Sequence, residues 1–307
     1  MRTQAIGAEI LKASECAPIA DGRTRPDRFP LWVWWNILSL DAPTIVCLWA
    51  LLFMQSLHII SHDWEVAAMV SAVWIIYVGD RMLDALRLPV LSGLSDRHRF
   101  YAQHGRAILG AFTPILFTTA WISLVRLGNA TRFAGLVMTA VVSLYFLAIH
   151  GIPHRVKKWF PKEIAAGGIF AVGAAIPTWM HAAGERKVLI PEVILFAGLC
   201  GLNCIAIECW EHNRGGRRWE GKPYWLIRLA DAHIARIASI LIVGGVSTGI
   251  FMVQKESHAD IFAASVFSLL ILIAIEWRSN RLSPQALRVL ADAALLTPLL
   301  FLLKGAL

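Results

Sequence analysis

Long runs of apolar residues, separated by short polar segments, recur from position 41 to the end of the chain. Each run is close to the ~20 residues that a helix needs to cross the hydrocarbon core of a bilayer. Inside a bilayer the backbone must satisfy its own polar groups, so such runs are expected to be helices. We expect nine of them, at 41–60, 64–80, 106–125, 133–152, 164–183, 188–210, 234–253, 260–277 and 285–303. The pattern predicts an all-α polytopic membrane protein, a bundle of about nine transmembrane helices.

Composition supports this class, because 57% of the residues are hydrophobic and 16% are charged, whereas soluble domains carry about 25% charged residues. The net charge of +8 indicates basic loops on the cytoplasmic side of a membrane rather than a nucleic-acid partner. The five cysteines form no Cys-x-x-Cys pair, and we expect most of them to pack in the apolar core. Glycines gather in the fifth run, which predicts a close approach of that helix to a neighbour.

Lysine and arginine are divided unequally between the two sides of this topology. Of the 29 in the chain, 23 lie in the N-terminal tail and in or beside the loops after the second, fourth, sixth and eighth helices. The positive-inside rule then predicts a cytoplasmic N-terminus and an outside C-terminus, in a membrane of the bacterial inner type. We expect residues 1–40 to be a cytoplasmic tail with an interfacial segment, and residues 41–307 to be the transmembrane domain.

Two acidic pairs end apolar runs on the predicted cytoplasmic side. Asp80 and Asp84 are four residues apart at the end of the second run, so they share one helix face, with Cβ atoms about 5–6 Å apart. Glu208 and Glu211 close the sixth run. Carboxylates this close need a cation, a proton or an arginine. Because Mg²⁺ binds carboxylates together with phosphate oxygens, two facing pairs predict a site that holds a diphosphate through Mg²⁺.

Simpler explanations stay open for these carboxylates. The two aspartates would pair with Arg81 and Arg87, and the two glutamates would form a solvated helix end with Arg214, as exposed ion pairs commonly do. His150 and the other histidines near the ends of the runs show no metal-ligand spacing.

Other polar residues on the same side are candidates for substrate contacts. The loop after the fourth helix carries Arg155, Lys157 and Lys158, which suit a diphosphate but also follow from the positive-inside rule alone. Asn203, within the sixth run, is expected either to hydrogen-bond between helices or to line the site. Asp231 is the most plausible polar participant in the loop after the sixth helix.

The order and sidedness of these motifs resemble the UbiA superfamily of intramembrane prenyltransferases. Asp80-Arg-Met-Leu-Asp84 is similar to the last part of the family's Asn-Asp-x-x-Asp-x-x-x-Asp motif, with Ile76 and Tyr77 at the leading positions. Further similar segments are Leu40-Asp41-Ala42-Pro43, Leu144-Tyr145, and Glu208 with Glu211 at the place of the second acidic motif.

The resemblance implies an enzyme that transfers a prenyl group from a prenyl diphosphate to an aromatic or lipid acceptor, with Mg²⁺ as cofactor. The implied catalytic and metal-binding residues are Asp80, Asp84, Glu208 and Glu211. The implied substrate-binding residues are Arg155, Lys157, Lys158, Asn203, Tyr77, Tyr145, Arg87 and Asp231.

Three alternatives remain at this point. A UbiA-type terpene cyclase would use the same site without an acceptor. An ion-coupled transporter would use its carboxylates near the bilayer midplane. A non-catalytic lipid-binding relative would bind the prenyl diphosphate without turnover, in keeping with the acidic positions that the motifs lack.

Overall fold

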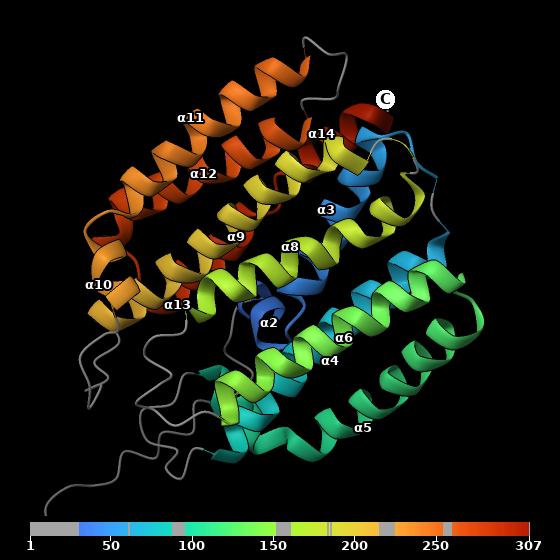
Figure 1. The fold of residues 1–307 in the computed structure, drawn as a ribbon. Coiled ribbons are helices and arrows are strands. Elements are labelled where there is room, and N and C mark those ends of the chain that lie inside the picture. Colours follow the sequence, from blue (N-terminus) through green and yellow to red (C-terminus); the bar gives the residue numbers. More distant parts are fainter. Residues whose placement is uncertain are drawn as a thin grey trace, which may run out of the picture. The chain divides into compact units, whose positions relative to one another are not determined.

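The structure is a computed structural model, and the residues it describes form helices and no strand (Figure 1). The described residues are 31–60, 62–87, 96–151, 161–182, 184, 186–214, 225–253 and 260–306. The chain divides into two units, Met1–Trp34 and Trp35–Leu307. Most of the predicted cytoplasmic tail lies outside the described residues, and the helix bundle is the second unit.

The bundle follows the short helix α2 (Leu31–Ile37) and is made mostly of long helices. They are α3 (Asp41–Ser56), α4 (Asp63–Arg87), α5 (Asp96–Val125), α6 (Asn129–Gly151), α8 (Lys162–His181), α9 (Arg186–Arg214), α10 (Trp225–Asp231), α11 (Ile234–Val253), α12 (Asp260–Arg278), the 3-10 turn η2 (Ser279–Arg281), α13 (Pro284–Ala294) and α14 (Pro298–Ala306).

The predicted fold class is confirmed, because the described part of the chain holds eight candidate spans that are long and apolar enough to cross a membrane. The remaining predicted span, 41–60, is the first along the chain and is shorter than expected. Its helix, α3, has 16 residues and is about 24 Å long at 1.5 Å per residue, against a hydrocarbon core of about 30 Å. The chain turns just after Ser56, where His58 has a positive φ of 52°.

Helix α5 begins earlier than predicted, at Asp96 rather than at position 106. Its first turns are polar and basic, so the pattern of apolar runs does not indicate them. His104 has non-helical angles, φ −110° and ψ 17°, and marks a kink near the start of the apolar span Phe100–Val125. Tyr101 is buried, so tertiary packing stabilises this polar extension of the helix.

Helix α3 lies inside the bundle and packs against α4, α8, α12, α13 and α14. Its Trp49 and Phe53 are fully buried. Trp49 stacks on Phe196 of α9, with ring centroids 4.0 Å apart, and its Nε1 donates a hydrogen bond to the carbonyl of Leu295 at 2.9 Å. Large aromatic side chains contribute much of the burial energy of a core, and here they tie α3 to the second half of the chain.

Helices α5 and α6 are much less buried than α3, since only 6% of the residues in the apolar span of each are buried. Their exposed side chains include Phe117, Trp121, Phe133 and Leu144. Apolar surface on this scale is not compatible with water, whereas lipid chains cover it at no cost. The exposed faces of α5 and α6 therefore support a multi-pass integral membrane protein.

Helix α8 packs most extensively on α9, and glycine makes the approach possible. A Cβ atom added at Gly167 would lie 2.4 Å from the backbone nitrogen and 2.7 Å from the Cα of Gly201. Contacts between small residues allow helix backbones to come this close in membranes.

The last span is broken between α13 and α14, at residues 295–297. Helix α12 supplies partners there: Thr297 Oγ1 donates to the carbonyl of Ala264 at 2.8 Å and lies 2.7 Å from Ser268 Oγ. A break inside a membrane is tolerated where neighbouring helices satisfy the freed polar groups.

The start of α13 is capped, because Ser283 Oγ accepts a hydrogen bond from the backbone N–H of Ala286 at 3.2 Å. Ser283→Ala is expected to lower stability by about 1 kcal/mol, measured as a lower Tm of the protein in detergent micelles. The control is Ser239→Ala on the exposed face of α11, where the hydroxyl donates to the carbonyl of Ala235. Equal Tm values for the two variants would rule out a stabilising cap at Ser283.

Candidate functional site

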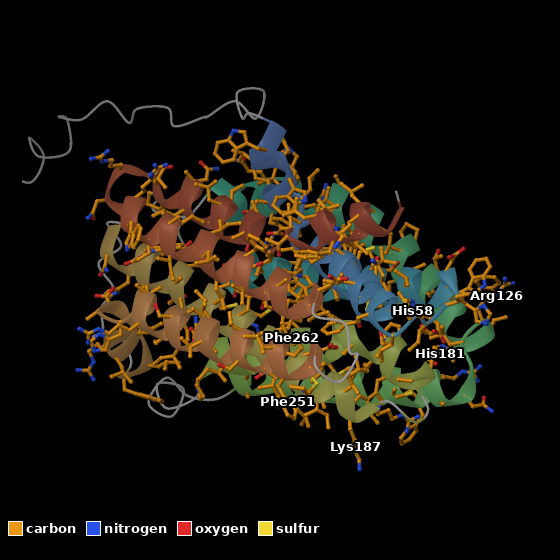
Figure 2. The ribbon with its side chains drawn as sticks, turned by 90° about the horizontal axis from the view of Figure 1, so that it is seen from above. His58, Arg126, His181, Lys187, Phe251 and Phe262 are labelled. Atoms are coloured by element: carbon orange, nitrogen blue, oxygen red, sulfur yellow. The ribbon has the colours of Figure 1, made fainter. Side chains whose placement is uncertain are left out.

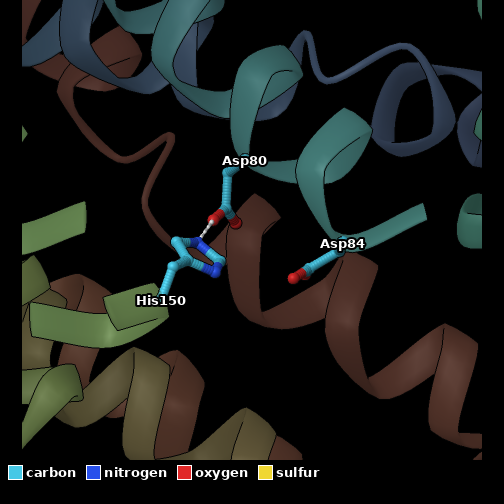
Figure 3. Close-up of side chains that lie close together, drawn as sticks. All are labelled: Asp80, Asp84 and His150. Carbon is cyan, nitrogen blue, oxygen red and sulfur yellow. Dashed lines mark hydrogen bonds and ion pairs between the residues drawn. The ribbon is translucent and has the colours of Figure 1, made fainter. Parts of the chain in front are cut away.

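The two aspartates at the end of α4 lie beside a histidine from α6 (Figure 3). Asp80, Asp84 and His150 each offer one ligand atom, and these atoms lie within 4.8 Å of one another. His150 Nε2 is 3.2 Å from Asp80 Oδ1. We call these three residues the acid–histidine cluster. It is the only grouping of three or more His, Cys, Asp or Glu with metal-site spacing that the described residues contain.

The geometry of the acid–histidine cluster follows partly from local structure. Asp80 and Asp84 share a face of α4, as their spacing predicted. His150 lies in the last turn of α6 and stacks on Phe146, with ring centroids 5.7 Å apart. The His150 side chain is 11% exposed and that of Asp80 is 44% exposed, so the cluster is accessible on the side of Asp80. His150 and Asp80 are 70 residues apart in the chain, and no local spacing could reveal their contact.

The second predicted acidic pair faces cations. Lys162 Nζ lies 3.4 Å from Glu208 Oε2 and 3.6 Å from Glu163 Oε1. Arg288 donates a hydrogen bond from Nη2 to Glu211 Oε1. Within the described ranges, neither glutamate of the pair joins the acid–histidine cluster. The structure therefore brings the two aspartates together with a histidine, and places the two glutamates in ion pairs of their own.

Tyr145 shows where the acid–histidine cluster lies relative to the second acidic pair, Glu208 and Glu211. Its hydroxyl lies 3.5 Å from the carbonyl oxygen of Lys162, whose side chain pairs with Glu208, and Tyr145 lies on α6 together with His150. Both acidic groups are therefore at the same end of the bundle, where α4, α6 and α9 end and α8 begins. Glu163 is buried, and sequence analysis did not single it out, because a glutamate in the first turn of a helix is common.

The other predicted site residues fall into different surroundings. The Arg81 guanidinium lies over the ring of Tyr77, 5.9 Å from its centroid. Asn203 Nδ2 donates to Asp292 Oδ1 at 3.4 Å. Asp231 is exposed at the end of α10 and hydrogen-bonds to the last turn of α9. Outside the described residues are Arg155, Lys157, Lys158 and the side chain of Arg87.

A second group of polar side chains, the buried polar network, lies within the bundle. Its members are Asn36, Ser39, Asp41, Arg81, Tyr101, Asn203 and Asp292. Arg81 donates from Nη1 to the carbonyl of Asn36 at 2.9 Å and to Ser39 Oγ, and its Nη2 lies 3.6 Å from Asp41 Oδ2. Arg81 is 4% exposed. Its guanidinium contacts Asn36, Ser39 and Asp41, and not Asp80 and Asp84, the partners that the simpler explanation gave it.

Asn36 joins the two carboxylates of the buried polar network. Its Nδ2 donates to Asp41 Oδ2 at 2.6 Å and to Asp292 Oδ2 at 3.1 Å. In the sequence, Asp41 stands out only as part of the Leu40-Asp41-Ala42-Pro43 segment, and Asp292 belongs to no motif. A single aspartate in an apolar run carries no spacing signal, but an ionisable residue inside a predicted span is itself a reason to expect function.

A separate ion pair lies at the opposite end of α4. His181 Nε2 is 2.7 Å from Glu65 Oε2, and Thr131 Oγ1 donates to Glu65 Oε1 at 3.0 Å. Figure 2 shows His181 at the same end as His58 and Arg126. This pair joins α4, α6 and α8 far from the acid–histidine cluster, so it holds the bundle together without contributing to the candidate site.

Compared with protein-family models, curated proteins and solved structures, the chain matches none. The resemblance to the UbiA superfamily therefore rests on the motifs of the chain itself. The function has to be inferred from the residues described above.

Proposed function

We propose that the chain is an integral-membrane prenyltransferase of the UbiA type, which transfers a prenyl group from a prenyl diphosphate to an aromatic or lipid acceptor. The observation that carries the proposal is the approach of Asp80, Asp84 and His150 at one end of an apolar bundle. A prenyl diphosphate has two matching parts, a charged head and an apolar tail. By the positive-inside rule, this end of the bundle faces the cytoplasm.

The acid–histidine cluster has a donor set that fits a divalent cation. Its two carboxylates suit Mg²⁺, and its imidazole also suits Zn²⁺ or Fe²⁺. A bound cation would neutralise the diphosphate and stabilise it as a leaving group. Asp80 and Asp84 hold the ligand oxygens on one helix face, and His150 orients the Asp80 carboxylate, a role that partners of metal ligands commonly have.

Basic residues at the same end support binding of the diphosphate head. Lys162 begins α8 and is 35% exposed. Arg155, Lys157 and Lys158 belong to the segment that joins α6 to α8 and lies outside the described residues. Lysine and arginine neutralise and hydrogen-bond phosphate oxygens, so this segment is the proposed contact for the leaving group.

The test incubates membranes containing the chain with radiolabelled prenyl diphosphates and a panel of aromatic acceptors, with Mg²⁺, Mn²⁺ or a chelator present. We expect a metal-dependent labelled product that Asp84→Ala reduces about 100-fold or more, because charge stabilisation at the leaving group is lost. His150→Ala is expected to reduce it about 10–100-fold. The matched control is Asp63→Asn, at the other end of the same helix, which should leave the rate unchanged.

The outcomes separate the alternatives. Labelled product without an acceptor would indicate cyclisation, and bound prenyl diphosphate without product would indicate a lipid-binding protein. Product formation that is independent of metal, or equal in Asp84→Ala and wild type, would refute the proposal.

A further inference from the structure

We propose that one end of the second half of the bundle is a docking surface for the headgroups of anionic phospholipids. This surface, which we call the basic rim, is made by α10, the start of α11, and the end of α12 with η2. Its exposed members are Trp225, Arg228, Arg236, Trp277, Arg278 and Arg281. None of them belongs to the acid–histidine cluster, so the proposal is independent of the proposed transferase activity.

Helix packing brings these segments to the same end of the bundle (Figure 1). A Cβ atom added at Gly249 would lie 3.2 Å from Phe262 Cβ, and one at Gly245 would lie 3.4 Å from Val266 Cγ2. Helices α11 and α12 are therefore antiparallel, and the start of α11 lies beside the end of α12. Asp231, at the end of α10, accepts a hydrogen bond from the last turn of α9. Because α9 ends where the acid–histidine cluster lies, the basic rim is at the end that the positive-inside rule assigns to the cytoplasm.

The first argument is the charge of the basic rim. Its four arginines form no ion pair with any residue in the part of the chain that the structure describes. Arg288 of the neighbouring α13, by contrast, pairs with Glu211. The described segments of the rim carry two carboxylates, Asp231 and Glu276. Four arginines against two carboxylates leave this surface positively charged, which suits an anionic partner.

The second argument is the apolar surface next to these charges, which identifies the partner as a lipid. Along α11, Ile240 and Val243 follow Arg236 at the spacing of one helix face, and both are exposed. Along α12, Trp277 directly precedes Arg278 and is 78% exposed. Apolar side chains followed by tryptophan and then by basic residues are typical of the passage from acyl chains to headgroups. A soluble anion or an acidic protein would leave the apolar part of this surface uncovered.

The chemistry of arginine favours phosphate-bearing headgroups with a net negative charge. The guanidinium donates two parallel hydrogen bonds to phosphate oxygens, and basic residues at a membrane surface are attracted to anionic lipids. A zwitterionic headgroup such as phosphatidylcholine offers the same phosphate but no net charge. We therefore expect the basic rim to select phosphatidylglycerol over phosphatidylcholine.

A lipid titration tests this selection on the purified full-length chain, in micelles of an uncharged detergent with phosphatidylcholine. Added phosphatidylglycerol is expected to raise Tm saturably, by about 2–5 °C at a concentration ~10 times its Kd. Equal Tm values with phosphatidylglycerol and with the same amount of extra phosphatidylcholine would overturn the proposal. An equal rise with soluble glycerol phosphate would overturn the assignment to a lipid.

Variants locate the surface. The double variant Arg228→Gln with Arg278→Gln is expected to weaken the affinity for phosphatidylglycerol about 30-fold. Its control, Lys187→Gln with Lys304→Gln, removes the same two charges from exposed positions at the other end of the bundle and should keep the wild-type affinity. An equal loss in both double variants, or no loss in the arginine variant, would contradict the assignment to the basic rim.

A direct measurement on the wild type does not depend on how well a variant folds. The chain is reconstituted in nanodiscs made of equal amounts of phosphatidylcholine and phosphatidylglycerol, and native mass spectrometry identifies the lipids that stay bound after release. We expect phosphatidylglycerol to be enriched among them. Retained lipids in the same ratio as the nanodisc would refute a preference for anionic headgroups.

Discussion

Replacing Gly167 with alanine is expected to destabilise the bundle by about 3 kcal/mol or more, the upper part of the range for overpacking. The new methyl group would meet backbone atoms rather than a flexible side chain, with Gly201 N at 2.4 Å and the carbonyl oxygen of Ala197 at 3.0 Å. Helices α8 and α9 would have to separate, and their contact is the most extensive in the bundle. We expect Tm in detergent to fall by about 10 °C.

The adjacent residue provides a control with the opposite sign. A Cβ atom at Gly168 would have nothing within 4 Å, so Gly168→Ala should raise stability by about 0.5–1 kcal/mol, because alanine is the better helix former. Gly201→Ala should be tolerated, since its Cβ would lie 3.7 Å from the nearest atom, Ile164 Cα. A Tm for Gly167→Ala at or above that of Gly168→Ala would show that the two helices do not approach closely at this point.

Arg81→Met is expected to cost about 3–5 kcal/mol, the usual result of removing one partner from a buried ion pair. The change leaves the Asp41 carboxylate without its cation and removes donors to the Asn36 carbonyl and Ser39 Oγ. The measurement is again Tm in detergent, together with the yield of monodisperse protein.

A double variant tests whether the cost comes from the Asp41 carboxylate that is left without its cation. Arg81→Met combined with Asp41→Asn should recover part of the lost Tm, because it removes the uncompensated charge. Arg228→Met, at an exposed position on α10, should change Tm little. If Asp41→Asn lowers Tm further in the Arg81→Met background, the pairing between these two residues is not the source of the cost.

The architecture was largely predictable because membrane spans are encoded locally, in the length of each apolar run. Two helix boundaries, the end of α3 and the start of α5, could not be predicted in this way. The run 41–60 is long enough to span, yet α3 ends at Ser56, because this helix is enclosed by protein and has no bilayer to match. The polar start of α5 carries no hydropathy signal, and its Tyr101 is buried by contacts that are distant in the sequence, such as that with Ser39.

The candidate site was predictable only where its geometry is local. The approach of Asp80 and Asp84 follows from their spacing on one helix. The addition of His150 depends on how α6 packs against α4, and the pairing of Glu211 with Arg288, 77 residues away, depends on how α9 packs against α13. The contact of Asn36 with Asp292 spans 256 residues, and no motif or period in a single sequence can indicate it.

The shortness of α3 has a consequence for the response of the protein to its lipids. A helix enclosed by other helices does not sense acyl-chain length, whereas α5 and α6, whose apolar spans have few buried residues, must tilt or stretch the leaflet around them when thickness changes. Reconstitution in thin or thick bilayers should therefore move α5 and α6 while the aromatic centre around Trp49 keeps its geometry.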